Sequence, residues 1–145
     1  MTRHSLPRSL GLALAGTLAV ALPLLAQSQA AAPVTTSSGL VYTSLVEGKG
    51  AGPTAADTVK VHYRGTFPDG KEFDSSYSRN APATFPLGRV IPCWTEGVQK
   101  MKVGGKAQLV CPPSIAYGER GAGNGAIPPN ATLRFEVELL EINPR

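Results

Sequence analysis

The stretch Thr58-Val59-Lys60-Val61-His62-Tyr63-Arg64-Gly65-Thr66 decides the expected fold, because apolar and cationic side chains alternate along it. The apolar set is Val59, Val61 and Tyr63, and the cationic set is Lys60, His62 and Arg64. This period of two predicts a strand with one buried and one solvated face. Because His62 falls on the solvated face, we expect no catalytic or metal-binding role for it.

A second alternating strand is expected over residues 132–142. Its apolar face carries Leu133, Phe135, Val137 and Leu139, opposite Arg134, Glu136 and Glu138. Because Glu136 and Glu138 lie beside Arg134 on the polar face, they indicate a solvated surface rather than a glycosidase pair. Weaker strand patterns over residues 40–46 and 106–111 complete a sheet with several antiparallel members.

One helix is expected after Pro92, since Trp94, Val98 and Met101 recur with helical spacing and Gly104-Gly105 provides a stop. A single short amphipathic helix must bury its apolar stripe, and the available partner is the apolar face of the sheet. The sequence therefore predicts an α+β domain over residues 39–145.

Residues 1–30 are typical of a secretory signal peptide. Arg3 and Arg8 form the charged start, and an apolar run follows from Leu10 to Ala26. Ser28 and Ala30 are the small residues of the cleavage site. A membrane anchor is the alternative, but the run is shorter than the ~20 residues of a span. We expect cleavage after Ala30, a flexible linker over residues 31–38, no membrane association afterwards, and a periplasmic or secreted location.

The composition excludes several function classes. The chain has 14 Lys+Arg against 10 Asp+Glu, a net charge of +4, without a basic cluster, so no nucleic-acid partner is expected. His62 is the only histidine outside the signal peptide, and we expect no metal or other cofactor. The glycine-rich residues 121–125 precede Pro128-Pro129 rather than a helix, which argues against a phosphate-binding loop.

Specific motifs follow one another in a fixed order along the chain. They are Val61-His62-Tyr63-Arg64-Gly65-Thr66, Asp69-Gly70-Lys71-Glu72-Phe73-Asp74-Ser75-Ser76, Leu87-Gly88, Val90-Ile91-Pro92, Trp94-Thr95-Glu96-Gly97, Ile115-Ala116-Tyr117-Gly118, Ile127-Pro128-Pro129-Asn130-Ala131-Thr132-Leu133 and Phe135-Glu136-Val137-Glu138-Leu139-Leu140. This set resembles the FKBP family of peptidyl-prolyl cis/trans isomerases over residues 39–142, and residues 90–97 resemble its bacterial secreted Mip-like branch. The resemblance implies an antiparallel sheet of about five to six strands wrapped around one short α-helix.

The resemblance also implies a pocket that binds proline. The implied catalytic residues are Asp74, Tyr117 and Phe135, and the implied substrate-binding residues are Tyr63, Phe73, Val90, Ile91, Trp94 and Ile127. Arg79 is implied to hold Asp74, whereas the Tyr117 hydroxyl and the Ile91 backbone N–H are implied to donate to carbonyls of a substrate or inhibitor. Taken singly, the aromatic residues would indicate ordinary core packing. The implied partners are proline-containing polypeptides and macrolide inhibitors of the FKBP class.

The expected chemistry is rotation about the peptide bond before proline. Resonance opposes this rotation by roughly 18–20 kcal/mol, and a twisted amide is less dipolar than a planar one. An apolar slot therefore disfavours the planar ground state more than the transition state, without a nucleophile or cofactor. A non-catalytic peptide-binding module or holding chaperone is the alternative function, and it would suppress aggregation without accelerating isomerisation.

Three departures from the family pattern affect the prediction. Ala83 stands where family members commonly carry another pocket aromatic, so the wall is expected to be thinner there. The loop over residues 118–126 is one residue longer than in short members, so its substrate contacts cannot be transferred. The secreted branch often adds a helical dimerisation region, for which only residues 31–38 are available, and we expect a monomer.

The two cysteines, Cys93 and Cys111, are an even number in a chain expected to be exported, where disulfides form readily. Cys111 points with Leu109 toward the expected core face, and Cys93 opens the helix that packs there. A bridge between them is the favoured prediction, with two separate buried thiols as the alternative.

Overall fold

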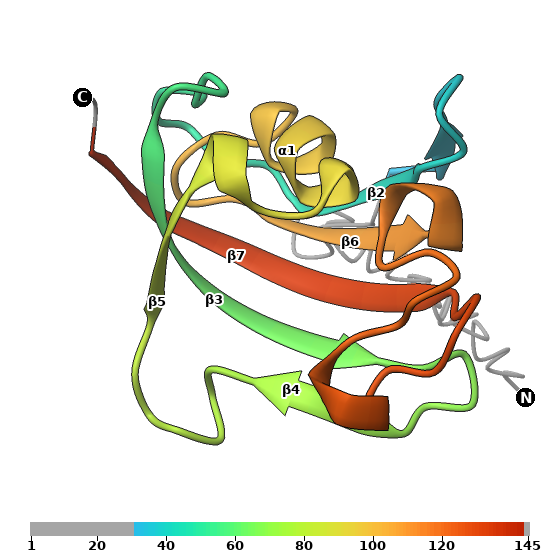
Figure 1. Ribbon diagram of the computed structural model, residues 1–145. Coiled ribbons are helices and arrows are strands. Elements are labelled where there is room, and N and C mark those ends of the chain that lie inside the picture. Colours follow the sequence, from blue (N-terminus) through green and yellow to red (C-terminus); the bar gives the residue numbers. More distant parts are fainter. Residues whose placement is uncertain (1–30, 144–145) are drawn as a thin grey trace, which may run out of the picture.

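The computed structural model describes residues 31–143, so the expected signal peptide at residues 1–30 lies outside the described part of the chain. Seven antiparallel strands form one sheet in the order β1-β2-β6-β7-β3-β4, and β5 pairs with β3 (Figure 1). The strands are β1 (Val34–Thr35), β2 (Val41–Val46), β3 (Thr58–Thr66), β4 (Glu72–Ser75), β5 (Ala83–Pro86), β6 (Lys106–Cys111) and β7 (Leu133–Asn143). The α+β architecture is confirmed, and the two-residue β1 brings the sheet to seven strands.

The centre of the sheet is the antiparallel pair β3 and β7, whose pairing runs from Thr58↔Asn143 to Thr66↔Arg134. The apolar residues of both strands are buried on one face, as the alternation predicts. The opposite face carries ion pairs, with 3.8 Å between Lys60 and Glu141 and 2.8 Å between Lys106 and Glu136. The sheet therefore has one apolar face that packs on the core and one polar face that contacts water.

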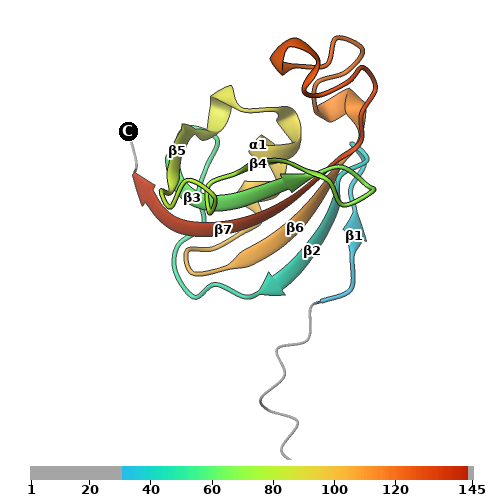
Figure 2. The ribbon, with the colours of Figure 1, turned by 90° about the horizontal axis from the view of Figure 1, so that it is seen from below.

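The helix α1 (Pro92–Gln99) covers that apolar face, and the sheet curves around it (Figure 2). Trp94 and Val98 are the residues of α1 that face the sheet, and they are buried, at 4% and 0% exposure. A Cβ atom at Gly97 would lie 2.7 Å from Cδ2 of Leu109, so the glycine allows α1 to approach β6 closely. Three short 3-10 helices, η2 (Leu87–Arg89), η3 (Pro113–Ile115) and η4 (Gly123–Gly125), lie in the connections.

The expected helix end at Gly104-Gly105 was wrong, because α1 stops at Gln99. The N–H groups of Lys100 and Met101 donate to the carbonyls of Gly97 and Val98, which tightens the last turn. Met101 is still buried, at 3% exposure, but it reaches the core from the turn after the helix. The helical spacing of Met101 from Trp94 and Val98 therefore results from this turn and not from a further turn of the helix.

The segment expected to be a flexible linker instead contributes ordered contacts. Val34 and Thr35 form β1, which pairs with Tyr42 and Val41 of β2. The hydroxyls of Thr36 and Ser38 donate to the Glu96 carboxylate over 2.9 and 2.6 Å. Because Glu96 lies on α1, these hydrogen bonds attach residues 34–38 to the helix.

A disulfide joins Cys93 at the start of α1 to Cys111 at the end of β6, as favoured from the sequence. Their Cα atoms are 5.8 Å apart, and both residues are fully buried. The bond therefore fixes the start of the helix against the sheet.

Candidate functional site

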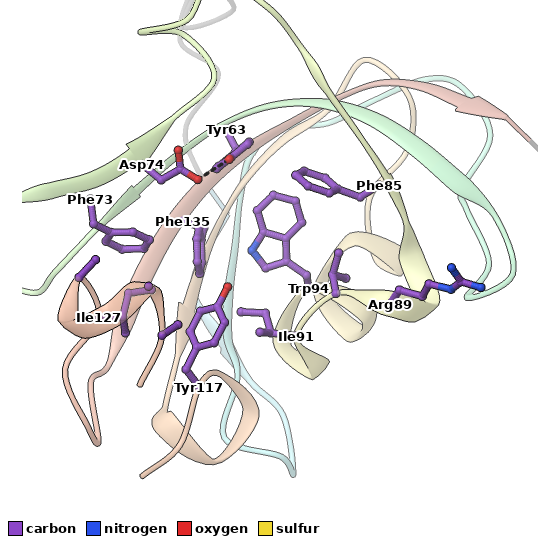
Figure 3. Close-up of a pocket in the computed structure, with 14 residues that line it drawn as sticks. Tyr63, Phe73, Asp74, Phe85, Arg89, Ile91, Trp94, Tyr117, Ile127 and Phe135 are labelled. Atoms are coloured by element: carbon purple, nitrogen blue, oxygen red, sulfur yellow. Dashed lines mark hydrogen bonds between the residues drawn. The ribbon is translucent and has the colours of Figure 1, made fainter. Parts of the chain in front are cut away.

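An apolar pocket of 480 Å³ opens beside the start of α1 (Figure 3). Four strands, the helix and two connections contribute to it, so no single segment of the sequence builds it. The lining residues are Tyr63, Phe73, Asp74, Phe85, Arg89, Val90, Ile91, Trp94, Tyr117, Ala122, Gly123, Ala126, Ile127 and Phe135. Most of these side chains are apolar or aromatic, which is typical of a ligand-binding pocket.

Trp94 forms the base of the pocket and contacts three other aromatic rings edge to face. Its ring centroid lies 5.3 Å from Tyr63, 5.5 Å from Phe85 and 5.4 Å from Phe135, with interplanar angles of 84°, 84° and 87°. Edge-to-face pairs of this kind contribute roughly 0.5–1.5 kcal/mol each beyond their area burial. These contacts fix the Trp94 ring, which makes the pocket largely pre-formed.

The backbone of Trp94 is held by its neighbours in the chain. Pro92 occupies the first turn of α1, where its missing N–H leaves no intrahelical bond unmade. The Thr95 hydroxyl donates to the Leu87 carbonyl over 2.7 Å and connects α1 to η2. The disulfide at Cys93 connects the same turn to β6.

Gly65 allows Phe73 to pack over β3. A Cβ atom at this position would lie 2.6 Å from Cζ of Phe73 and 3.0 Å from Cε1 of Phe135. The rings of Phe73 and Phe135 themselves meet edge to face, with centroids 5.6 Å apart. The motif glycine is therefore required for this wall of the pocket.

The polar edge of the pocket is a hydrogen-bonded group of Tyr63, Asp74 and Arg79. The Tyr63 hydroxyl donates to Asp74 Oδ2, and Arg79 Nη1 donates to Asp74 Oδ1 over 2.6 Å. Arg79 Nη2 also donates to the Tyr63 hydroxyl over 3.0 Å. Asp74 is thus oriented from both sides.

These contacts determine the protonation states at the polar edge. Burial raises the pKa of Asp74, but hydrogen bonds from Tyr63 and Arg79 and the Arg79 charge outweigh it and hold that pKa below its ordinary value. Burial, followed by the bond to Asp74, raises the pKa of the Tyr63 hydroxyl. The bonds to Asp74 and Tyr63 raise the pKa of Arg79. At neutral pH the group is therefore carboxylate, phenol and guanidinium.

Two hydrogen-bond donors at the pocket remain available to a ligand. The Tyr117 hydroxyl points toward the middle of the pocket in Figure 3, and it makes no hydrogen bond to another described residue, unlike the hydroxyls of Tyr42, Tyr63 and Tyr77. Burial, with a smaller contribution from the Asp74 charge, raises the pKa of Tyr117 and keeps it protonated. The Ile91 backbone N–H likewise has no partner within residues 31–143.

The model of one protein family, described as FKBP-type peptidyl-prolyl cis-trans isomerase, matches residues 50–140. The chain belongs to this family. It is 56% identical over 110 residues to the FKBP-type isomerase FkpA of Escherichia coli K12, and 53% identical over 107 residues to the FKBP-type 22 kDa isomerase of that organism. These alignments cover 76% and 74% of this chain, but 40% and 52% of the relatives. The chain therefore spans about half the length of these FKBP relatives or less.

Solved FKBP structures have the same fold. The crystal structure of FkpA from Escherichia coli superposes with a TM-score of 0.74 at 54% identity, covering 77% of this chain and 52% of that one. The crystal structure of AtFKBP13 gives a TM-score of 0.71 at 37% identity, covering 78% of this chain and 100% of that one. The family's antiparallel sheet around one helix is therefore reproduced here.

The structure brings the sequence-predicted pocket residues of the FKBP domain together. Tyr63, Phe73, Asp74, Val90, Ile91, Trp94, Tyr117, Ile127 and Phe135 all line the same cavity. Arg79 is not in the lining, and it contacts the site through Asp74 and Tyr63. The roles assigned to these residues remain predictions.

Sequence reasoning missed five lining residues: Phe85, Arg89, Ala122, Gly123 and Ala126. The family pattern drew the prediction to Ala83, and Phe85 was not considered. Residues two apart on a strand share a face, so Phe85 could have been expected on the same side as Ala83. The Phe85 ring lies against Trp94, whereas Ala83 does not line the pocket. The loop residues carried no usable signal, because the pairing of Ala122 with Ile127 turns this loop toward the pocket.

The other residues considered from the sequence, His62, Glu136 and Glu138, lie on the opposite face of the sheet. His62 is half-buried rather than fully solvated, because its ring stacks on Tyr77 with centroids 4.6 Å apart and its Nδ1 lies 2.8 Å from the Ser76 hydroxyl. Glu138 accepts a hydrogen bond from the Tyr77 hydroxyl, and Glu136 pairs with Lys106. Within residues 31–143 no cluster of potential metal ligands occurs.

None of the helices in the described part of the chain has the length and apolar character needed to cross a membrane.

Proposed function

We propose that this protein accelerates rotation about X-Pro peptide bonds in exported polypeptides. The observation that carries the proposal is the pre-formed aromatic pocket, with the Trp94 ring at its base and unpaired donors from Tyr117 and Ile91 beside it. Family membership supports the same activity. A proline ring on Trp94 would leave the adjoining carbonyls within reach of these donors.

The chemistry follows from the electronic structure of the amide. The cis and trans forms of an X-Pro bond differ by only about 0.5–1 kcal/mol, but the barrier between them is roughly 18–20 kcal/mol. Rotation removes the resonance that charges O and N, so the transition state is less dipolar than either planar form. A pocket walled by Phe73, Phe85 and Phe135 excludes water and therefore favours the twisted amide.

Each residue has a proposed part in this reaction. Trp94, Tyr63, Phe73, Val90 and Ile127 hold the proline, and Phe135 excludes water from the rotating bond. Tyr117 and the Ile91 N–H fix the carbonyls on either side. Asp74, held by Arg79 and Tyr63, supplies a negative field near the amide.

Desolvation and positioning rank above acid–base catalysis in this proposal. Rotation transfers no proton, so the reaction has no step that requires a general base. The depressed pKa of Asp74 also makes this carboxyl a poor proton donor at neutral pH. Asp74 therefore acts through its charge and its hydrogen bonds.

The setting of the activity is part of the proposal. The N-terminal pattern supports export to the periplasm or medium, and the Cys93–Cys111 bond suits an oxidising compartment. We propose that the protein acts there as a monomer on proline-containing polypeptides. We also propose that macrolide inhibitors of the FKBP class occupy the same pocket.

The deciding experiment compares isomerisation with chaperone activity. The purified protein, at substoichiometric concentration, should accelerate cis/trans exchange in a short X-Pro peptide, measured by NMR exchange or a protease-coupled assay. Suppression of client aggregation without any change in that exchange rate would replace the proposal by a holding chaperone. A macrolide inhibitor should abolish the acceleration, and it should quench or shift Trp94 fluorescence in the same concentration range.

A further inference from the structure

Arg89 is a cation at the edge of the pocket that the mechanism above does not use. It lies in η2, two residues before Ile91, and its side chain is exposed. Figure 3 shows it at the Phe85 end of the pocket, opposite Phe73 and Ile127, with its guanidinium directed away from Trp94. Arg89 also lines an adjoining hollow of 220 Å³ with Asp57 and Pro86. The two depressions therefore meet at Arg89.

The charge of Arg89 is not neutralised within the described chain. The four ion pairs among residues 31–143 involve Lys60, Arg64, Arg79 and Lys106. The other cation near the pocket, Arg79, is already bound to Asp74. The Asp57 carboxylate borders the same hollow, but it accepts the Thr54 N–H over 2.8 Å and lies beyond ion-pair distance from Arg89. Among residues 31–143, Arg89 is thus the cation without an ion pair at this end of the pocket.

A polypeptide held in the pocket must leave past its edges. Its backbone advances about 3.3 Å per residue when extended, so the residues that flank the proline pass the edges of the pocket, and one of these edges carries Arg89. A carboxylate there would face an unpaired guanidinium, which can bind it through two parallel hydrogen bonds. A lysine there would meet a like charge.

We propose that Arg89 is a specificity-determining residue that favours substrates with Asp or Glu within two residues of the proline. This preference rests on the proposed isomerase function. Because Arg89 is exposed, the preference is modest, about two- to five-fold in kcat/KM, the range expected for solvent-accessible ion pairs. It must also weaken with salt, since screening acts over about 10 Å at 0.1 M.

The test measures kcat/KM for two series of matched peptides. One series carries Glu, Gln or Lys two residues before the proline, and the other carries them two residues after it. We expect the order Glu, Gln, Lys in at least one series, with the Glu/Gln ratio falling toward one as salt is raised. In Arg89→Gln the ratio should approach one, and in Arg89→Glu the order should reverse.

Lys102→Gln is the matched control. Lys102 is exposed and lines neither the pocket nor the adjoining hollow, so its removal changes net charge equally but should leave the Glu/Gln ratio intact. Equal acceleration of all peptides in both series would overturn the preference and leave the isomerase function standing. A Glu preference that persists in Arg89→Gln would also overturn it. No acceleration of any peptide would overturn the function and the preference together.

Discussion

Asp74 is the residue whose role divides the possible mechanisms, because it is charged and lies at the edge of an otherwise apolar pocket. We expect Asp74→Ala to lower kcat/KM about tenfold, a loss of roughly 1.4 kcal/mol in transition-state stabilisation, because the negative field near the amide is removed. The loss is partial because the aromatic pocket still desolvates the amide. The measurement is peptide isomerisation, with circular dichroism to verify the fold.

Glu141→Ala is the control for Asp74→Ala, because it removes an exposed carboxylate on β7 whose one ion pair in the described part of the chain is with Lys60 at 3.8 Å. Its kcat/KM should equal that of the wild type. A folded Asp74→Ala protein with no activity would show that the carboxylate, rather than desolvation, dominates catalysis.

Gly65 provides a second prediction at the residue scale. A methyl group at this position meets Phe73 at 2.6 Å, so Gly65→Ala must push the ring out of the pocket wall. We expect a loss of about 1–3 kcal/mol in the free energy of unfolding, as for other overpacked sites, together with a lower kcat/KM. Urea denaturation measures the first effect, and peptide isomerisation measures the second.

The Phe73→Leu change tests the cause of the Gly65→Ala effect. Leucine lacks the ring atoms that meet the new methyl group, so the double variant should be less destabilised than the sum of the single variants. Strict additivity would place the strain elsewhere.

Among the elements, the disulfide is the connection with the largest expected effect on stability. It joins α1 to β6 across 18 positions, and closing a loop of this length contributes about 3 kcal/mol in the chain-entropy model. The Cys93→Ala/Cys111→Ala double variant should lose a similar amount, and reduced wild type should behave like it in urea. The same midpoint for oxidised and reduced wild type, or two reactive thiols in the denatured non-reduced protein, would contradict this.

The elements differ in how far the sequence predicts them. β3, β6 and β7 alternate between buried and more exposed residues over most of their length, because each has one face on the core and one in water, and their ranges were predicted to within one residue. The four-residue β4 and β5 were not predicted, since both depend on pairing with β3 rather than on their own pattern. The end of α1 was wrong because a buried Met101 fits a turn as well as a helix.

At the scale of the whole molecule, the candidate site was predictable as a set of residues but not as a shape. The family motifs named nine lining residues, although their separation along the chain gives no distance between them. Phe85 enters the pocket through the long-range pairing of β5 with β3, and Ala122 enters it through a local pairing with Ile127 that no sequence pattern predicts. Likewise, only the three-dimensional structure shows that the positive charge of Arg89 lies at one end of the pocket.

The pH dependence of the whole protein should separate stability from catalysis. Asp74 has a pKa below its ordinary value of 3.8, so the stability it contributes is present above that pH and is lost as the pH falls through the folded-state pKa. Tyr63 and Tyr117 have pKa values raised above 10.0, so their contributions are complete below that pH and are lost as the pH rises through the raised values.

No group of the polar edge titrates between these limits. We therefore expect kcat/KM to stay constant from about pH 5 to about pH 9, after correction for the uncatalysed rate, because desolvation requires no proton. Unfolding monitored by Trp94 fluorescence should become easier in acid, and less steeply so in Asp74→Asn, which cannot gain that proton. A bell-shaped kcat/KM profile centred near neutrality would instead require a titrating acid or base in the reaction.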